Sequence, residues 1–173
     1  MSEKSSSNKE RKARVYTVMM VPVTGQFVVL LEDIEGTRLL PIWIGRGEGE
    51  SILIKLQKVS LPRPITHDLL VNILKTVKFK IEKIVITDLI DNTYYAEITI
   101  IREKEKIVVD ARPSDAIAVA LRCKAKIFIS QRVLDKCPVV SKPISQKEVD
   151  EFKQELESLN PTDFFKDLGN LEG

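Results

Sequence analysis

The order of strand-like and helical segments, which occurs twice along the chain, constrains the fold more than any other feature. Three segments rich in apolar and β-branched residues are joined at Thr24-Gly25 and Glu35-Gly36, residue types that favour turns. They are 15–23, 27–33 and 38–44. Apolar residues then recur at helical spacing over 47–59. The first half therefore predicts a three-strand meander followed by a helix.

The second half repeats this order. Its strand-like segments are 81–90, 93–101 and 106–110, and an apolar helix is expected over 113–123. In each half a short polar segment joins the third strand to the helix, IGRGEGES (44–51) and DARPSDA (110–116). We predict an α+β fold of two β-β-β-α units, suggesting an internal duplication, with a mainly antiparallel sheet packed with helices.

The remaining segments add two helices and a strand. Thr66 is the expected N-cap of a helix with one apolar face. That face comprises Leu69, Leu70, Ile73, Leu74 and Val77. A strand is expected at 126–130 and a short turn or helix at 133–137. A C-terminal helix should begin at a capping box of Ser145 and Glu148, followed by an apolar turn at 164–168.

Charge divides the chain into three expected parts. Residues 1–14 hold five Lys or Arg and two Asp or Glu without hydrophobic periodicity, which predicts a disordered basic leader. Residues 15–140 should form the domain, and 141–173 an acidic helical tail. The body is only mildly basic, so its charge fits either a nucleic-acid ligand or a solvated surface.

Composition narrows the class of protein. No apolar run approaches the roughly 18 residues of a membrane helix, and the N-terminus lacks the apolar centre of a secretory signal. Cys123 and Cys137 have neither CxxC spacing nor a nearby histidine, which predicts reduced thiols and no zinc site. We expect a cytoplasmic protein with no membrane partner.

The helix expected over 113–123 is apolar or small at nearly every position from 116 to 121, so it should be buried on most sides. Asp115, Ala118 and Arg122 form a polar or small stripe along it. A carboxylate at the start of a buried helix requires a partner. Arg63, Arg112 or a metal ion could supply it.

Candidate chemistry lies in carboxylates and arginines at the ends of elements. The chain lacks GxxxxGK, GxGxxG after a strand, GxSxG and HExxH, and it has one histidine, His67. Three or more converging acids would suit Mg²⁺ or Mn²⁺, because these hard cations prefer oxygen ligands. The candidate ligands are Glu48, Asp68, Asp110 and Asp115. Arg63 and Arg112 could hold phosphate oxygens, or could simply pair with the acids to fix the helix starts.

The segment PRPITHDLL (62–70) allows two interpretations. His67 lies at the border of an apolar helix face and Asp68 opposite it, so Asp68 could serve the helix dipole while His67 packs at the edge. Alternatively, His67 assists proton transfer in a catalytic site. If 62–68 and 110–115 form one site, His67 or Asp68 must lie within hydrogen-bond or one-water reach of Arg112 or Asp115.

Four segments, in this order along the chain, resemble the bifunctional nuclease family. They are LPIWIG followed by Glu48 (40–48), PRPITHDLL (62–70), VITDLIDNTYYA (85–96) and DARPSDAIAVALR (110–122). The resemblance covers about Val15 to Cys137. Two departures are Asn92, where the family has glycine, and Gly49, where alanine is usual.

The resemblance implies nuclease activity on RNA and DNA, assisted by a divalent metal, in a self-associating protein. The residues within matching motifs are Glu48, Arg63, His67, Asp68, Asp110, Arg112, Ser114 and Asp115. In the resulting hypothesis Asp68, Asp110 and Asp115 hold the ion. Arg63, Arg112 and Ser114 bind substrate, and His67 handles a proton.

Two other functions use the same residues. In a non-catalytic module that binds nucleic acid or protein, they would form a structural lattice of ion pairs. In a regulatory domain they would line a small-ligand pocket. Unpaired edge strands and apolar residues near the C-terminus further predict a homo-oligomer, with a dimer favoured.

Overall fold

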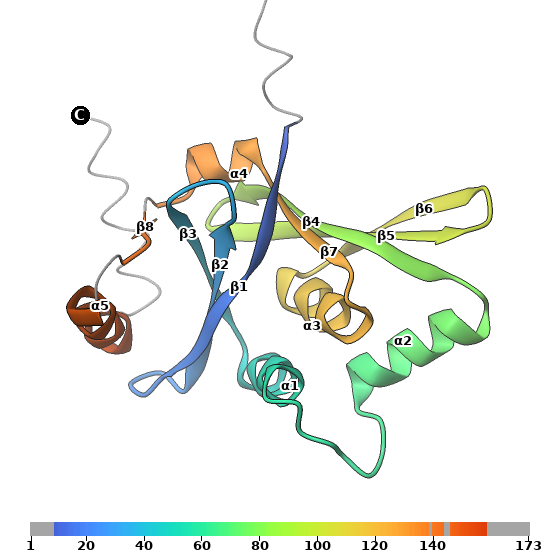
Figure 1. The fold of residues 1–173 in the computed structure, drawn as a ribbon, viewed down its shortest axis with the longest axis horizontal. Coiled ribbons are helices and arrows are strands. Elements are labelled where there is room, and N and C mark those ends of the chain that lie inside the picture. The colour runs from blue at the N-terminus through green and yellow to red at the C-terminus, as the bar shows by residue number, and fades with distance from the viewer. Residues whose placement is uncertain (1–8, 139, 144–145, 159–173) are drawn as a thin grey trace, which may run out of the picture.

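The computed structural model describes residues 9–138, 140–143 and 146–158 of the 173-residue chain. Its strands form one sheet in the order β6-β5-β4-β7-β1-β2-β3-β8 (Figure 1). They are β1 (Glu10–Val21), β2 (Gln26–Asp33), β3 (Arg38–Ile44), β4 (Lys80–Ile90), β5 (Thr93–Arg102), β6 (Glu105–Ala111), β7 (Lys126–Ser130) and β8 (Val140–Ser141). Neighbours are antiparallel except β4 and β7, so the predicted α+β class with a mainly antiparallel sheet is confirmed.

The two predicted units flank the central strand β7. Strand β1 pairs with β7 antiparallel and β4 pairs with it parallel, so the two meanders run in opposite directions. A pseudo-two-fold axis perpendicular to the sheet gives this relation and keeps the helices of both units on one face. The repeated order in the sequence is therefore matched by a repeated arrangement in space.

Five helices accompany the sheet in the described part of the chain. They are α1 (Arg46–Leu56), α2 (Thr66–Thr76), α3 (Pro113–Cys123), α4 (Gln131–Lys136) and α5 (Gln146–Ser158). The main core joins α1, α3 and part of α2 to one face of the sheet, and Ala116 to Ala120 of α3 are buried at its centre. None of these helices is both long and apolar enough to cross a lipid bilayer.

The other face is covered only in part. Val21, Val28, Leu30 and Leu39 form a second cluster, against which Phe152 of α5 packs. Strand β2 is therefore buried on both faces, whereas exposed and buried residues alternate along the first half of β5. Helix α5 lies at the β1–β3 end of the sheet and β6 at the opposite end (Figure 1).

The disordered leader predicted over residues 1–14 extends too far along the chain. Strand β1 begins at Glu10, because residues 10–13 pair with β7. Arg11 and Arg14 bind Asp33 and Glu32 of β2, with N–O distances of 2.9 and 2.6 Å. The expected capping residue Ser145 and the turn at 164–168 lie outside the described residues.

The apolar face of α2 lies largely in solvent. Leu69, Leu70, Ile73 and Val77 are each at least 40% exposed, and only Val71 is fully buried, with Leu74 packed against the core. The N-cap is Ile65 rather than Thr66. Helix α2 contacts α3 along its inner edge only, which leaves most of its apolar face in solvent.

Candidate functional site

Each of the three helices on the core face has a carboxylate at its third position. The N-caps are Gly45, Ile65 and Arg112. The third residues are consequently Glu48, Asp68 and Asp115. Carboxylates in a first helical turn are favoured by the positive end of the helix dipole. The fold thus brings three acids to the starts of neighbouring helices.

His67 joins two of these helices through both ring nitrogens. Its Nε2 lies 3.0 Å from Asp115 Oδ1, and its Nδ1 lies 2.8 Å from Ser51 Oγ of α1. An ionised carboxylate only accepts hydrogen bonds, so Nε2 carries the proton toward Asp115 and, in the neutral ring, Nδ1 accepts from the Ser51 hydroxyl. The predicted proximity of segments 62–68 and 110–115 is confirmed.

Arg112 connects the starts of the two helices of the repeat. Its Nε donates to Asp115 Oδ2 at 2.7 Å, and its Nη2 donates to Glu48 Oε1 at 2.9 Å. The third-position acids of α1 and α3 therefore meet at one guanidinium. Arg112 is 66% exposed, and its Nη1 has no hydrogen-bond partner among the described residues.

Arg122 makes a second, buried connection behind the first. Its side chain is 3% exposed; Nε donates to Asp68 Oδ1 at 2.6 Å and Nη2 to Ser51 Oγ at 3.0 Å. A continuous series of hydrogen bonds therefore runs from Asp68 through Arg122, Ser51, His67, Asp115 and Arg112 to Glu48. The predicted stripe of Asp115, Ala118 and Arg122 is the side of α3 that makes these bonds.

The pKa shifts reflect this pairing. Burial raises the pKa of Asp115, but hydrogen bonds from Arg112 and His67 outweigh it, so the pKa lies below its ordinary value. Burial likewise opposes ionisation of Asp68, yet the Ile65 N–H and Arg122 hold its pKa below the ordinary range. The hydrogen bond to Asp115 raises the pKa of Arg112. These acids and Arg112 are therefore charged at neutral pH.

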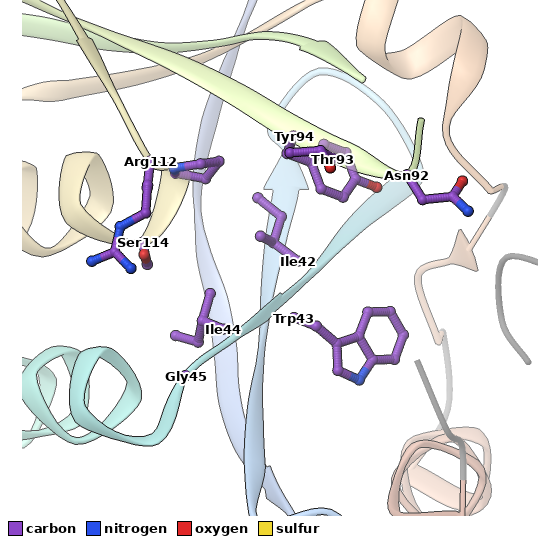
Figure 2. Close-up of a pocket in the computed structure, with 10 residues that line it drawn as sticks. Ile42, Trp43, Ile44, Gly45, Asn92, Thr93, Tyr94, Arg112 and Ser114 are labelled. Carbon is purple, nitrogen blue, oxygen red and sulfur yellow. The ribbon is translucent and has the colours of Figure 1, made fainter. Parts of the chain in front are cut away.

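Two cavities meet at Arg112. One of about 330 Å³ is lined by the paired groups and the start of α2: Gly47, Glu48, Ser51, Ile65, Thr66, His67, Arg112 and Asp115. Figure 2 shows the other, of about 270 Å³, between the end of β3 and the starts of β5 and α3. Ser114, Arg112, Tyr94 and Trp43 are among its lining residues. Arg112 can therefore be reached from either cavity.

Three of the predicted site residues lie apart from this network. Arg63 is exposed in the α1–α2 loop, without an ion pair in the described part of the chain. Ser114 is buried and lines only the second cavity. Asp110 lies opposite Glu97, next to the Ile98–Val109 pair whose Ile98 is in the core. Because side chains alternate along a strand, Asp110 points to the sheet face away from the helices.

The four carboxylates do not fit a single metal site. Glu48 and Asp115 bind Arg112, Asp68 binds Arg122, and Asp110 is on the other face of the sheet. Within the described ranges, no group of three or more His, Cys, Asp or Glu side chains is arranged to hold a metal ion. We therefore derive no catalytic step through a metal.

Ser51 and Arg122 belong to the site but were not among the residues predicted for it from the sequence. Ser51 reads as an ordinary polar residue in a glycine-rich segment, although it is 5% exposed and bonds to His67. Arg122 belongs to the recognised stripe, but a stripe does not reveal which partners face it. The acids of the site, in contrast, each lie three residues after an observed N-cap.

Comparison with known proteins places all residues of this network within a single matched domain. The family model described as the bifunctional nuclease domain matches residues 29–142. An uncharacterized protein of Mycobacterium tuberculosis is 34% identical over 162 residues, which are 88% of this chain and 97% of that protein.

Plant proteins match a shorter region. Bifunctional nuclease 1 of Oryza sativa subsp. japonica is 28% identical over 109 residues, which are 61% of this chain and 33% of the rice protein. Bifunctional nuclease 2 of Arabidopsis thaliana is 26% identical over 107 residues, or 60% of this chain and 32% of the plant protein. The similarity thus spans about one third of each plant protein.

Proposed function

This chain belongs to the bifunctional nuclease domain family, and from that premise we propose that it hydrolyses phosphodiester bonds of RNA and DNA at the cavity between α1, α2 and α3. The observation that carries the proposal is one wall of that cavity, where His67 and an exposed arginine share Asp115. A proton acceptor beside a cationic phosphate-binding group is what phosphodiester hydrolysis requires.

Arg112 is the proposed phosphate-binding group. Asp115 and Glu48 fix its guanidinium from two sides, while Nη1 has two N–H donors to offer. A guanidinium held in this way is pre-oriented for phosphate oxygens and for the negative charge that grows on them during hydrolysis. The cavities on either side of Arg112 leave space for the nucleic-acid chain to continue in both directions.

His67 is the proposed proton acceptor. Because Asp115 orients its Nε2–H, Nδ1 can take a proton from the Ser51 hydroxyl or from a water molecule that replaces it. Asp115 also stabilises the cationic ring that results. Ser51 is held in place by Arg122, which donates to the same hydroxyl oxygen.

The proposal is tested with labelled RNA and DNA and purified full-length variants. We expect His67→Ala and Arg112→Ala each to reduce cleavage by about a hundredfold or more, the range typical of a lost proton-transfer group or charge-stabilising donor. Arg132→Ala is the matched control: Arg132 is also exposed and ion-paired, but lies on α4 beside Asp88. Cleavage that survives both site substitutions would contradict this location.

Metal dependence is measured in the same assay. We expect Mg²⁺ or Mn²⁺ because of the carboxylates in the matching motifs and because of the family resemblance. The described residues contain no group of side chains arranged to hold the ion. Cleavage that stops in EDTA and returns with either ion would support a metal-assisted reaction. Equal cleavage with and without EDTA would contradict a metal-assisted reaction and would mean that the side chains alone catalyse it.

A non-catalytic binding module is the second candidate, because every residue in the series from Asp68 to Glu48 is hydrogen-bonded to another residue of the series. In that case the network only braces three helices. His67→Ala would then lower the melting temperature markedly, and wild-type protein would bind RNA without cleaving it. Retained stability together with lost cleavage would favour the nuclease.

A further inference from the structure

We infer that a cavity beside the C-terminal half of α2 binds a small amphiphile, an aliphatic chain that ends in a carboxylate. The cavity has a volume of about 390 Å³. This volume lies within the roughly 300–1,000 Å³ of small-molecule sites in proteins. The cavity shares no lining residue with the two cavities that meet at Arg112. The inference therefore does not depend on the proposed nuclease activity.

The cavity is a consequence of how α2 packs. Val71 is the fully buried residue of this helix, and Leu74 packs against the main core from one turn further on. The chain then passes through Phe79 into β4, while α3 ends at Cys123 (Figure 1). The end of α2, the start of β4 and the end of α3 together enclose the space.

The walls of the cavity are apolar. Val71 and Phe79 belong to the main core, and Leu74, Ile81 and Cys123 pack against it. A strongly polar group placed against these walls would lose its hydrogen bonds to water without replacing them. An aliphatic chain would instead remove apolar surface from water, both its own and that of the walls. The walls therefore favour a ligand with an aliphatic body.

Arg122 also lines the cavity, but its guanidinium is already engaged. Its Nε, Nη1 and Nη2 donate to Asp68, the Ala118 carbonyl and Ser51 respectively. The side chain is 3% exposed, and Asp68 balances its charge. An anionic group of a ligand must therefore be bound by other residues.

Three lysines supply the positive charge. Lys75, Lys80 and Lys124 line the cavity and are exposed, and none of them forms an ion pair within the described part of the chain. Lysine packs its aliphatic stem against apolar surface while its ammonium group stays in water. The described residues that line the cavity include no Asp or Glu. Charge complementarity therefore favours a carboxylate at the mouth, with its chain inside.

Calorimetric titration of the full-length protein with octanoate tests this class of ligand. We expect saturable binding of one octanoate per chain. The dissociation constant should be at least tenfold lower than that of 1-octanol, which lacks the charge, or of acetate, which lacks the chain. Adenosine monophosphate carries its charge on a polar body and should not compete. Equally tight binding of 1-octanol, or competition by the nucleotide, would overturn the inference.

Charge variants test the role of the lysines. The double variant Lys75→Gln/Lys80→Gln should raise the octanoate dissociation constant about fivefold or more, because two exposed charges each contribute modestly. Lys55→Gln/Lys58→Gln is the matched control. It removes two exposed charges from the end of α1 and the segment after it, outside the cavity, and should leave the constant within about twofold. Equal effects of the two double variants would show only unspecific attraction of an anion.

Two further measurements test the location. Cys123→Phe places a larger side chain in the cavity, so a folded variant, verified by its thermal melt, should no longer bind octanoate. Amide NMR spectra of the wild-type protein give the same test without a substitution: octanoate should shift the signals of residues 71–81 and 122–124. Binding retained by folded Cys123→Phe, or shifts confined to residues outside these two segments, would overturn the inference.

Discussion

Asp68 and Asp115 occupy equivalent positions in their helices, yet their arginine partners differ in burial. The Arg122 side chain is 3% exposed, whereas Arg112 is 66% exposed. A buried charge that loses its partner cannot be solvated by water. Removing the partner of a buried charge is therefore more destabilising than breaking an exposed ion pair. Asp68, and not Asp115, is therefore the acid that neutralises a buried arginine.

This difference predicts unequal effects of two matched substitutions. We expect Asp68→Asn to lower the free energy of unfolding at neutral pH by about 2 kcal/mol, discounted because Asp68 is partly exposed. Asp115→Asn should lower it by about 1 kcal/mol. Urea denaturation of both variants measures this, and a larger loss for Asp115→Asn would contradict the assignment.

The same variants should differ from wild type in acid. The pKa of Asp68 is lowered in the folded state, so its stabilising effect is present above the unfolded-state pKa of about 3.9. That effect is lost as the pH falls through the lower folded-state pKa. The free energy of unfolding, measured by urea denaturation between pH 7 and 2, should therefore fall less steeply below about pH 4 for Asp68→Asn than for the wild type.

At the scale of elements, the start of α1 is fitted closely to β2. A Cβ atom built on Gly49 would lie 2.3 Å from Cγ of Phe27, so the helix approaches the strand more closely than alanine permits. The family resemblance had suggested alanine at this position. The large Phe27 side chain explains why this chain has glycine instead.

Gly49→Ala should therefore destabilise the protein by about 1–2 kcal/mol, although alanine has the higher helix propensity. Gly47→Ala in the same helix is the control, since a Cβ there meets nothing within 4 Å and should cause no loss. Adding Phe27→Leu to Gly49→Ala should recover part of the stability. Thermal melts of these variants test the close approach, and equal effects at the two glycines would disprove it.

At the scale of the whole molecule, the two faces of the sheet are covered by different parts of the chain. Helices α1 and α3, with part of α2, complete the main core, whereas α5 closes a smaller cluster over β1–β3 through Phe152. Lys142, which precedes α5, is paired with the buried Glu32 of β2. The main core is thus complete without α5.

Phe152→Asp should consequently release α5 without unfolding the domain. We expect faster hydrogen exchange in residues 146–158 and on β2, with exchange at α3 unchanged. Glu151→Asp is the control, because Glu151 is exposed on the same helix. Loss of protection throughout the sheet would show instead that α5 is part of the cooperative core.

The sequence by itself determined the two β-β-β-α units, because strand and helix periods and turn residues are local signals. Helix α3 and strands β3 and β7 have the predicted bounds, and the other predicted strands differ from the observed ones by a few residues. The pairing of Asp115 with Arg112 was also predictable, since a carboxylate at the start of a buried helix requires a partner. The contact of His67 with Asp115 agrees with the expectation that 62–68 and 110–115 form one site.

Only the tertiary structure decided which side chains face one another across elements. Ser51 and Arg122 entered the site because α1 and α3 pack side by side, a relation that no local pattern encodes. Asp110 lies outside the site because successive side chains of a strand point to opposite faces of the sheet. The apolar side of α2 became surface for the same reason: periodicity shows that a helix has an apolar face, but only packing decides what covers it.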